Sequence, residues 1–241
     1  MKMVMDKALV DSLKVMLTFP LEIVKAGFML GLFYFLYIAS GLLPILLLFY
    51  IIVGLNLWTY YMPYIFLVVF VISYLVVLYF LSGVSAAFGR LMIDLEKNRI
   101  KFSLFRFIEL TSHYASRMFI FEILKAFILL IVLLPIIGVL VILNMFEMSL
   151  IFIPLLYLGI WAITLFIPCS LVMEDVHLMV AIKNGLGMIR KKPVDWILLI
   201  FMFTIIGVIF LVIPVVNVLL YMFVFLPLLW ITTCLTYHSG R

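Results

Sequence analysis

The sequence predicts an all-α integral membrane protein with six transmembrane helices arranged as three hairpins. Three observations support this class. The 241-residue chain is 69% hydrophobic and only 11% charged, it contains six long apolar runs, and its basic residues avoid the turns within the predicted hairpins. Soluble domains are nearer half apolar and a quarter charged. No polar stretch is long enough for a separate soluble domain, so we expect one membrane domain over residues 1–241.

Each apolar run is long enough to be a transmembrane helix, which needs about twenty residues. The first run exceeds this length, so we expect it to tilt, kink at Pro44 or extend beyond the bilayer. Short turns near Leu55–Met62, Asn144–Met148 and Pro214–Asn217 join the runs in pairs. The six predicted spans are residues 27–55, 63–89, 121–143, 150–172, 195–213 and 216–236.

The basic residues predict the orientation. All sixteen Lys and Arg residues fall on one side of the six-span arrangement. Because cytoplasmic loops are enriched in Lys and Arg, we expect the protein in the cell membrane with both termini cytoplasmic. This topology also accounts for the net charge of +5, so no nucleic-acid partner is expected. Residues 1–19 carry scattered charges rather than the continuous apolar core of a cleavable signal.

Scarce polar residues and prolines indicate a threefold parallel repeat over residues 5–100, 101–175 and 176–241. Each copy would place a short cytoplasmic amphipathic helix before two spans. The predicted amphipathic helices are residues 5–19, 102–118 and 176–190. They would rest on the lipid headgroups or form a collar that docks a partner.

An acidic residue stands at the start of the first span in each copy. Residues 21–27 read LEIVKAG and residues 121–127 read FEILKAF, so Glu22 with Lys25 and Glu122 with Lys125 form similar pairs. In the third copy, Asp195 takes the acidic place. A carboxylate suits the positive N-terminal end of a helix, and a lysine one turn later can reach the headgroups. We interpret the pairs as boundary markers. The alternative is a functional Glu–Lys gate at the membrane mouth.

Two further groups of residues are candidates for binding or packing. Small side chains are expected to permit close helix packing, and a basic cluster before Pro193 is expected to attract anionic lipid. The packing residues are Gly27, Gly31, Ser82, Ser85, Ala86 and Gly89, and the lipid-binding residues are Arg190, Lys191 and Lys192.

The sequence contains no recognisable catalytic or metal-binding constellation. No charged residue lies at the middle of a predicted span, which argues against ion-coupled transport. The three histidines lack a metal-ligand spacing, and no phosphate-binding or dinucleotide-binding motif is present. We therefore expect neither cofactor nor metal. Cys169 and Cys234 are expected to act as small apolar residues rather than as a disulfide.

The stretch 181–200, AIKNGLGMIRKKPVDWILLI, carries a family resemblance. Its order of small residue, polar turn, basic cluster, proline and apolar span resembles uncharacterised polytopic membrane families. These include the membrane domain fused to some glycerophosphodiester phosphodiesterases. Ala181, Asn184, the basic cluster and Pro193 carry the resemblance, with an echo at Ala8, Ser12 and Pro20. It implies six helices and carries over no activity, because these residues have no counterpart of the catalytic domain.

Three functional classes follow. We expect a non-enzymatic scaffold or accessory subunit that binds lipid, a partner protein or a second copy of itself through its basic cytoplasmic face. The alternative is a passive carrier or channel for a lipid or another apolar solute, which a central cavity between the hairpins would favour. An intramembrane enzyme would require polar side chains that converge inside the bilayer.

Overall fold

The computed structural model describes residues 4–54, 62–98, 102–212 and 224–240. Over these ranges the protein is helical throughout apart from short turns, and it contains no strand, as the all-α class predicts. The elements are α1 (Val4–Thr18), α2 (Pro20–Gly54), α3 (Met62–Asn98), α4 (Leu104–Ile142), η1 (Phe146–Met148), α5 (Ser149–Thr164), α6 (Ile167–Glu174), α7 (Leu178–Lys191), α8 (Pro193–Val212) and α10 (Leu226–Gly240).

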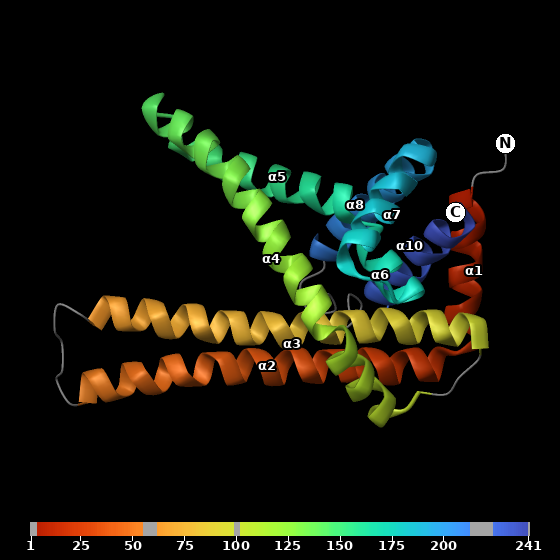
Figure 1. Ribbon diagram of the computed structural model, residues 1–241, viewed down its shortest axis with the longest axis horizontal. Coiled ribbons are helices and arrows are strands. Elements are labelled where there is room, and N and C mark those ends of the chain that lie inside the picture. The colour runs from red at the N-terminus through yellow and green to blue at the C-terminus, as the bar shows by residue number, and fades with distance from the viewer. Residues whose placement is uncertain (1–3, 55–61, 99–101, 213–223, 241) are drawn as a thin grey trace.

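The helices form two long arms that extend from a common base (Figure 1). Helices α2 and α3 lie side by side as the first arm, while α4 and α5 form a second arm that diverges from it. Helices α1, α6, α7 and α10 gather in the base. At 1.5 Å per residue, the 35 residues of α2 extend for about 50 Å, more than the roughly 30 Å of a hydrocarbon core.

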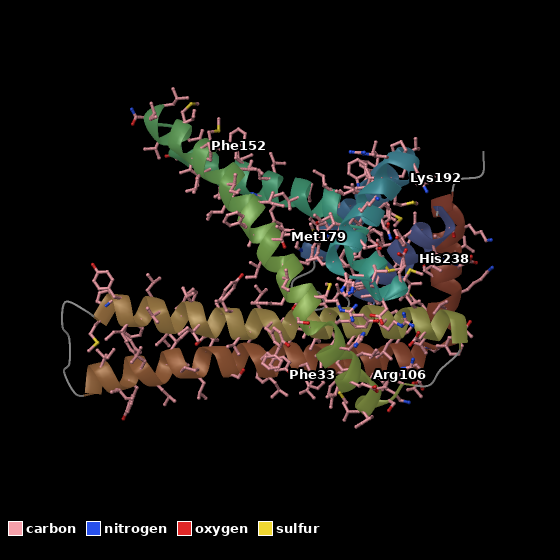
Figure 2. All side chains as sticks on the ribbon, in the orientation of Figure 1. Phe33, Arg106, Phe152, Met179, Lys192 and His238 are labelled. Carbon is pink, nitrogen blue, oxygen red and sulfur yellow. A yellow bond between two sulfur atoms is a disulfide. The ribbon has the colours of Figure 1, made fainter. Side chains whose placement is uncertain are left out.

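Four helical segments are long and apolar enough to cross a membrane. They are Pro20–Gly54, Met62–Leu95, Leu104–Ile142 and Ile151–Glu174. In the first three, only 6% of the most apolar window is buried inside the protein, so the arms expose an apolar surface that water would not favour. Figure 2 shows arm side chains such as Phe152 far from Lys192, which lies at the end of α7 in the base. This distribution fits an integral membrane protein.

The count of six spans is not confirmed. The described apolar part of α8, Pro193–Ile206, is shorter than a membrane span. The predicted sixth span, residues 216–236, lies partly outside the described residues. Its described end belongs to α10, whose Thr232 and Cys234 are buried in the base. The hairpin arrangement, the threefold repeat and its boundaries remain predictions.

Of the three predicted turns between paired spans, the structure describes one throughout. A turn followed by η1 occupies the position predicted over Asn144–Met148. The turn near Pro214–Asn217 lies outside the described residues, as does all but the end of the turn near Leu55–Met62. Helix α2 continues through Pro44 without interruption.

Two of the three predicted amphipathic segments form separate short helices, and the third does not. Residues 5–19 coincide closely with α1, and residues 176–190 coincide closely with α7. The expectation of a separate short helix over residues 102–118 is wrong, because these residues begin the continuous helix α4. No Gly or Pro occurs between residues 104 and 134, so nothing interrupts the helical hydrogen bonding there.

Proline changes the direction of the chain between α5 and α6. Residues 165–166 interrupt the helix between the end of α5 at Thr164 and the start of α6 at Ile167, and Pro168 follows this break. Proline provides no backbone N–H and its ring displaces the carbonyl four residues earlier, which here belongs to Thr164. The Thr164 hydroxyl donates a hydrogen bond to the Ile160 carbonyl at 2.7 Å. The break turns α6 into the base (Figure 1).

The two cysteines form a disulfide. Cys169 of α6 and Cys234 of α10 are bonded, with their Cα atoms 5.2 Å apart. Our expectation that they act as separate small apolar residues is therefore wrong. The bond connects positions 65 residues apart in the sequence, a contact that only the packing of α6 on α10 creates.

Glycine permits the closest approach of α3 to α4. A Cβ atom at Gly83 would lie 2.6 Å from the carbonyl oxygen of Thr111 and 2.9 Å from the Cβ of Ala115. Further along the same interface, the rings of Tyr79 and Phe119 meet edge to face at 5.5 Å. Residues without bulky side chains allow such close contact between membrane helices.

We predict that Gly83→Ala destabilises the protein by about 1–3 kcal/mol, because the added methyl group forces α3 away from α4. Gly138→Ala is the matched control, since nothing lies within 4 Å of a Cβ at that helical position, and it should be neutral or stabilising by up to about 1 kcal/mol. Thermal unfolding of the two variants in detergent measures the difference. Equal unfolding temperatures would contradict the close contact.

Candidate functional site

Two neighbouring cavities, here called the junction cavities, lie where the arms meet the base. The inner cavity has a volume of about 170 Å³ and is lined by residues of α3, α4, α5, α6 and α10. The outer cavity measures about 250 Å³ and lies among α3, α4 and α5. Glu122, Lys125 and Trp161 line both cavities. A charged pair therefore separates a space near the base from a space between the arms.

The shared charges form a direct ion pair. Lys125 Nζ lies 2.7 Å from Glu122 Oε2, and the two side chains are 18% and 28% exposed, respectively. The same ammonium lies 4.9 Å from the centre of the Phe121 ring, an arrangement that adds a cation–π contact. Twenty residues of α4 separate Glu122 from the helix end at Ile142. They correspond to about 30 Å of helix, the thickness of a hydrocarbon core.

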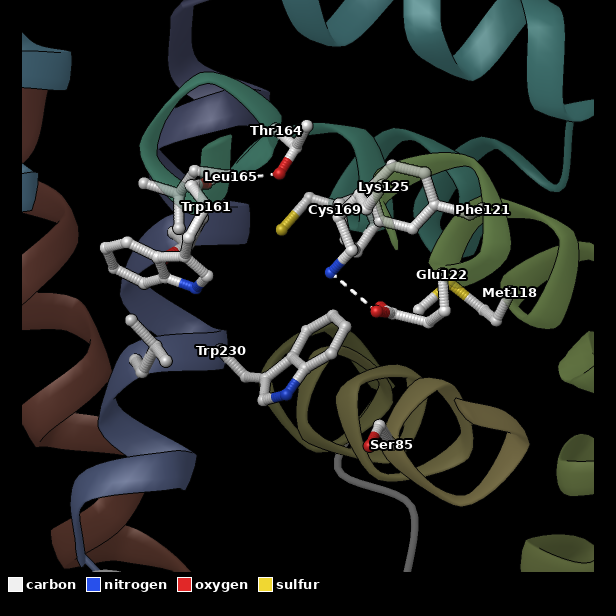
Figure 3. A pocket seen from close by; sticks show the side chains of 13 residues that line it. Ser85, Met118, Phe121, Glu122, Lys125, Trp161, Thr164, Leu165, Cys169 and Trp230 are labelled. Atoms are coloured by element: carbon white, nitrogen blue, oxygen red, sulfur yellow. Dashed lines mark hydrogen bonds and ion pairs between the residues drawn. The ribbon is translucent and has the colours of Figure 1, made fainter. Parts of the chain in front are cut away.

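Aromatic and hydroxyl side chains complete the inner cavity. Figure 3 shows the Glu122–Lys125 contact facing the space bordered by Trp161, Trp230 and Cys169. Trp230 is held there by α3, because its ring occupies the space that a Cβ at Gly89 would take. Thr233 also lines the cavity. Its hydroxyl is buried without a hydrogen-bond partner in the described part of the protein.

A buried carboxylate connects the arms to the base. Asp94 of α3 is only 2% exposed. It lies 3.2 Å from Arg90 Nε and 2.5 Å from Arg106 Nη2. Arg90 Nη1 also donates a hydrogen bond to the Val172 carbonyl of α6 at 2.7 Å. These contacts fix α3, α4 and α6 at one point.

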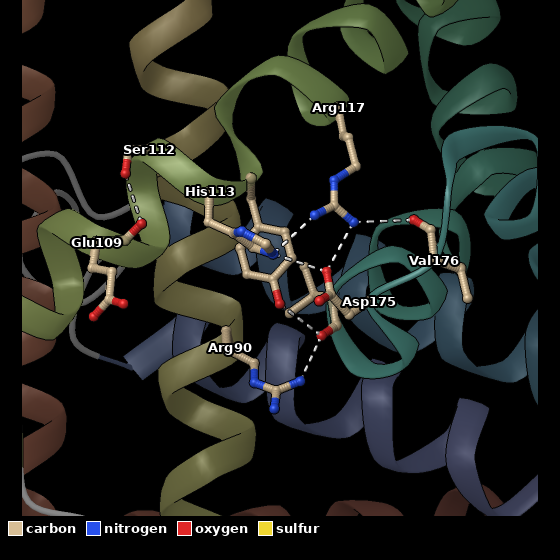
Figure 4. A network of polar contacts seen from close by, with 9 residues as sticks. Arg90, Glu109, Ser112, His113, Arg117, Asp175 and Val176 are labelled. Atoms are coloured by element: carbon tan, nitrogen blue, oxygen red, sulfur yellow. Dashed lines mark hydrogen bonds and ion pairs between the residues drawn. The ribbon is translucent and has the colours of Figure 1, made fainter.

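A second polar group holds α4 against the turn between α6 and α7 (Figure 4). Asp175 Oδ1 accepts a hydrogen bond from Arg117 Nη1 at 2.8 Å and lies 2.9 Å from His113 Nε2. Asp175 ends α6 with a left-handed φ of 50°, which reverses the chain. The hydrogen bonds from His113 and then Arg117 lower the pKa of Asp175 despite an opposing effect of burial. A lowered pKa keeps the carboxylate ionised, so its contribution to stability is lost only as the pH falls below the usual range of Asp.

The similar Glu–Lys motifs occupy different environments. Lys25 Nζ lies 3.0 Å from Glu22 Oε1, so both predicted pairs form. Glu22 also accepts a hydrogen bond from the Phe102 backbone N–H at 2.7 Å. Asp195 is buried in the first turn of α8. Of these three predicted positions, the pair on α4 lines the junction cavities.

The predicted lipid-binding cluster lies at the end of α7. Arg190 and Lys191 occupy its last turn, and Lys192 is its C-terminal cap. Lys183 and Lys191 line a third cavity of about 160 Å³ together with residues that include Tyr237. No ion pair joins any of these four cations to a carboxylate in the ranges that the structure describes.

The predicted packing residues lie on α2 and α3. Gly27, Ser82 and Ala86 are buried, and Gly31 is half-buried. Ser85 also faces the inner cavity, and its hydroxyl oxygen lies 2.6 Å from that of Tyr34. The sequence reasoning did not select Gly83, although its contact with α4 is tight.

Sequence reasoning also missed Thr233 and both cavity tryptophans. Trp161 and Trp230 lie in apolar runs that provide no local reason to single them out. The threonines of the last run offered a signal, because Thr232, Thr233 and Thr236 place three hydroxyls in a short helix. All three are buried in the base.

Comparison of the chain with protein-family models, curated proteins and solved structures finds no match. Within the described residues, no three His, Cys, Asp or Glu side chains gather closely enough to hold a metal ion. The arrangement of the site therefore carries the functional argument. Its elements are a partly buried ion pair, two tryptophans and a hydroxyl without a hydrogen-bond partner in the described chain, together with the unpaired cations on α7.

We predict that Asp94→Asn destabilises the protein by roughly 3 kcal/mol, because it leaves two arginines without their shared buried partner. Asp175→Asn is the control, since that side chain is 52% exposed and an exposed pair contributes at most about 1 kcal/mol. Chemical unfolding in detergent gives both values. An equal or larger loss for Asp175→Asn would contradict the central role of Asp94.

Proposed function

We propose that this protein is a non-enzymatic membrane scaffold that binds anionic lipid through the basic end of α7. The observation that carries the proposal is the separation of apolar arms from a cationic base. Residues 26–89 and 126–182 contain no Lys or Arg, and these ranges hold most of the two arms. In this proposal the arms lie in the cell membrane, and the base lies on the cytoplasmic side with both termini.

The unpaired cations support lipid binding. Lys14, Lys25, Arg90, Arg106, Arg117 and Lys125 each have an acidic partner, whereas the four cations of α7 and its cap have none in the described chain. A lysine or arginine beside an anionic membrane surface contributes about 1 kcal/mol. The cavity lined by Lys183 and Lys191 offers an anionic headgroup two ammonium groups.

The proposal includes six spans and three parallel hairpins. The strongly apolar 20-residue helix α8, with Asp195 in its first turn, is suited to begin a third hairpin. Its return span would be residues 216–236. The exposed surface of the base would then be available to a partner protein or to a second copy of the chain.

A second candidate is passive transfer of lipid. The junction cavities favour it, because they place a charged pair next to a space between apolar arms. We assign no catalytic activity. The Ser112 hydroxyl, one residue from His113, donates its hydrogen bond to the Glu109 carbonyl rather than to the histidine (Figure 4).

We predict that combined replacement of Arg190, Lys191 and Lys192 by Gln lowers the preference for anionic lipid by about tenfold or more, because three contributions near 1 kcal/mol are lost. Native mass spectrometry of protein released from nanodiscs containing phosphatidylglycerol and phosphatidylcholine measures the lipid retained.

The matched control replaces Lys7, Lys14 and Lys25 by Gln. It removes the same charge from exposed positions of α1 and α2. This control should retain most of the preference. Equal losses in the two triple variants would show an effect of net charge alone and would contradict a binding surface on α7.

A further inference from the structure

We propose that the junction cavities bind the zwitterionic headgroup of a phospholipid, with its ammonium at Glu122 and its phosphate at Lys125 and Thr233. This site is separate from the basic surface of α7. It requires the arms to lie in lipid but does not depend on anionic lipid binding at the base.

The charge of the cavity wall selects a zwitterion. Glu122 and Lys125 are the only charged residues that line either cavity in the described structure, so the wall has no net charge. A simple anion at Lys125 would also approach the carboxylate, and a simple cation at Glu122 would also approach the ammonium. A ligand with both charges satisfies both groups.

The ion pair retains hydrogen-bonding capacity. An ammonium has three donors, and a carboxylate can accept about four hydrogen bonds. Within the described residues, each group has one polar contact, which is the contact with the other. Because the side chains are largely removed from solvent, a ligand that supplies a phosphate oxygen and an ammonium hydrogen would compete effectively with water.

Thr233 provides an independent indication of a ligand. Its side chain is 3% exposed, its hydroxyl has no hydrogen-bond partner in the described chain, and it lines the inner cavity. Buried hydroxyls are normally paired, since leaving one unpaired is unfavourable. The hydroxyl oxygen itself is enclosed, so a phosphate oxygen in the inner cavity would accept its hydrogen bond after the side chain rotates toward the cavity.

Aromatic side chains fit the remaining parts of such a ligand. Trp161 and Trp230 border the inner cavity (Figure 3), and indole rings bind ammonium groups through cation–π contacts. The outer cavity is lined by Tyr74, Leu78 and Leu129, which suit the glycerol and the first acyl carbons. Because these residues belong to the exposed arms, the geometry favours a lipid over a soluble headgroup compound.

The test measures binding of dioctanoyl phosphatidylethanolamine to the 241-residue protein in detergent by native mass spectrometry, with tryptophan fluorescence as a second readout. We expect Glu122→Gln and Lys125→Met to weaken binding at least tenfold. Thr233→Val should weaken it several-fold without lowering the unfolding temperature, because it removes an unpaired polar group. This last variant keeps the test valid where a charge replacement impairs folding.

The controls separate this site from the other features. Lys25→Met breaks the equivalent ion pair away from the junction cavities and should not change binding, and neither should the triple replacement on α7. In the triple variant of α7, which lacks the basic cluster, dioctanoyl phosphatidylglycerol and soluble phosphoethanolamine should each bind at least tenfold more weakly than dioctanoyl phosphatidylethanolamine. Equal binding of phosphatidylglycerol would overturn the zwitterion assignment, and equal binding of phosphoethanolamine would overturn the lipid assignment. Unchanged binding in the Glu122, Lys125 and Thr233 variants would overturn the site itself.

Discussion

The arrangement of the helices depends on the buried carboxylate of Asp94. In lipid, apolar helices gain little from packing on one another, because the acyl chains are equally apolar. Polar contacts and close backbone approach must therefore determine how the arms meet. Asp94 supplies the polar contact by pairing with Arg90 and Arg106, and Arg90 extends it to α6. The close approach occurs further along α3, at Gly83.

The division between arms and base accounts for the distribution of polar groups. The arms expose apolar side chains, whereas Asp94, Asp175 and the disulfide lie in or beside the base. The junction cavities occupy the boundary between these environments. A charged pair is tolerated there because each charge has its partner 2.7 Å away, while an unpaired charge among acyl chains would be strongly unfavourable. The same position suits tryptophan, which favours membrane interfaces.

The sequence predicted features that depend on local patterns. Apolar run lengths indicated the long helices, amphipathic spacing indicated α1 and α7, and the three-residue spacing of Glu122 and Lys125 placed both on one face of a helix. The sequence also indicates that α4 is continuous, because residues 104–134 contain no Gly or Pro. The separate short helix predicted over residues 102–118 is wrong because no helix breaker ends it before the apolar run.

The unpredicted features all depend on contacts between distant segments. The Cys169–Cys234 disulfide requires α6 to lie on α10, and the Asp94–Arg106 pair requires α4 to return along α3. Thr233 is a candidate ligand contact for two reasons. It lines a cavity, and its hydroxyl has no hydrogen-bond partner in the described chain. Neither property can be predicted from the sequence. A single sequence provides residue types and spacing, but these pairings are determined by how the helices pack.

The central claim is that the arms cross a membrane and leave the base on the cytoplasmic side. Single cysteines at Asn144, in the turn at the tip of the second arm, and at Ser112, exposed near the base, test it directly in intact cells with a membrane-impermeant maleimide. The native cysteines are buried, so they contribute little background. Asn144→Cys should react in intact cells, and Ser112→Cys should react only after permeabilisation. Labelling of Ser112→Cys in intact cells, or equal labelling of both variants, would contradict the account.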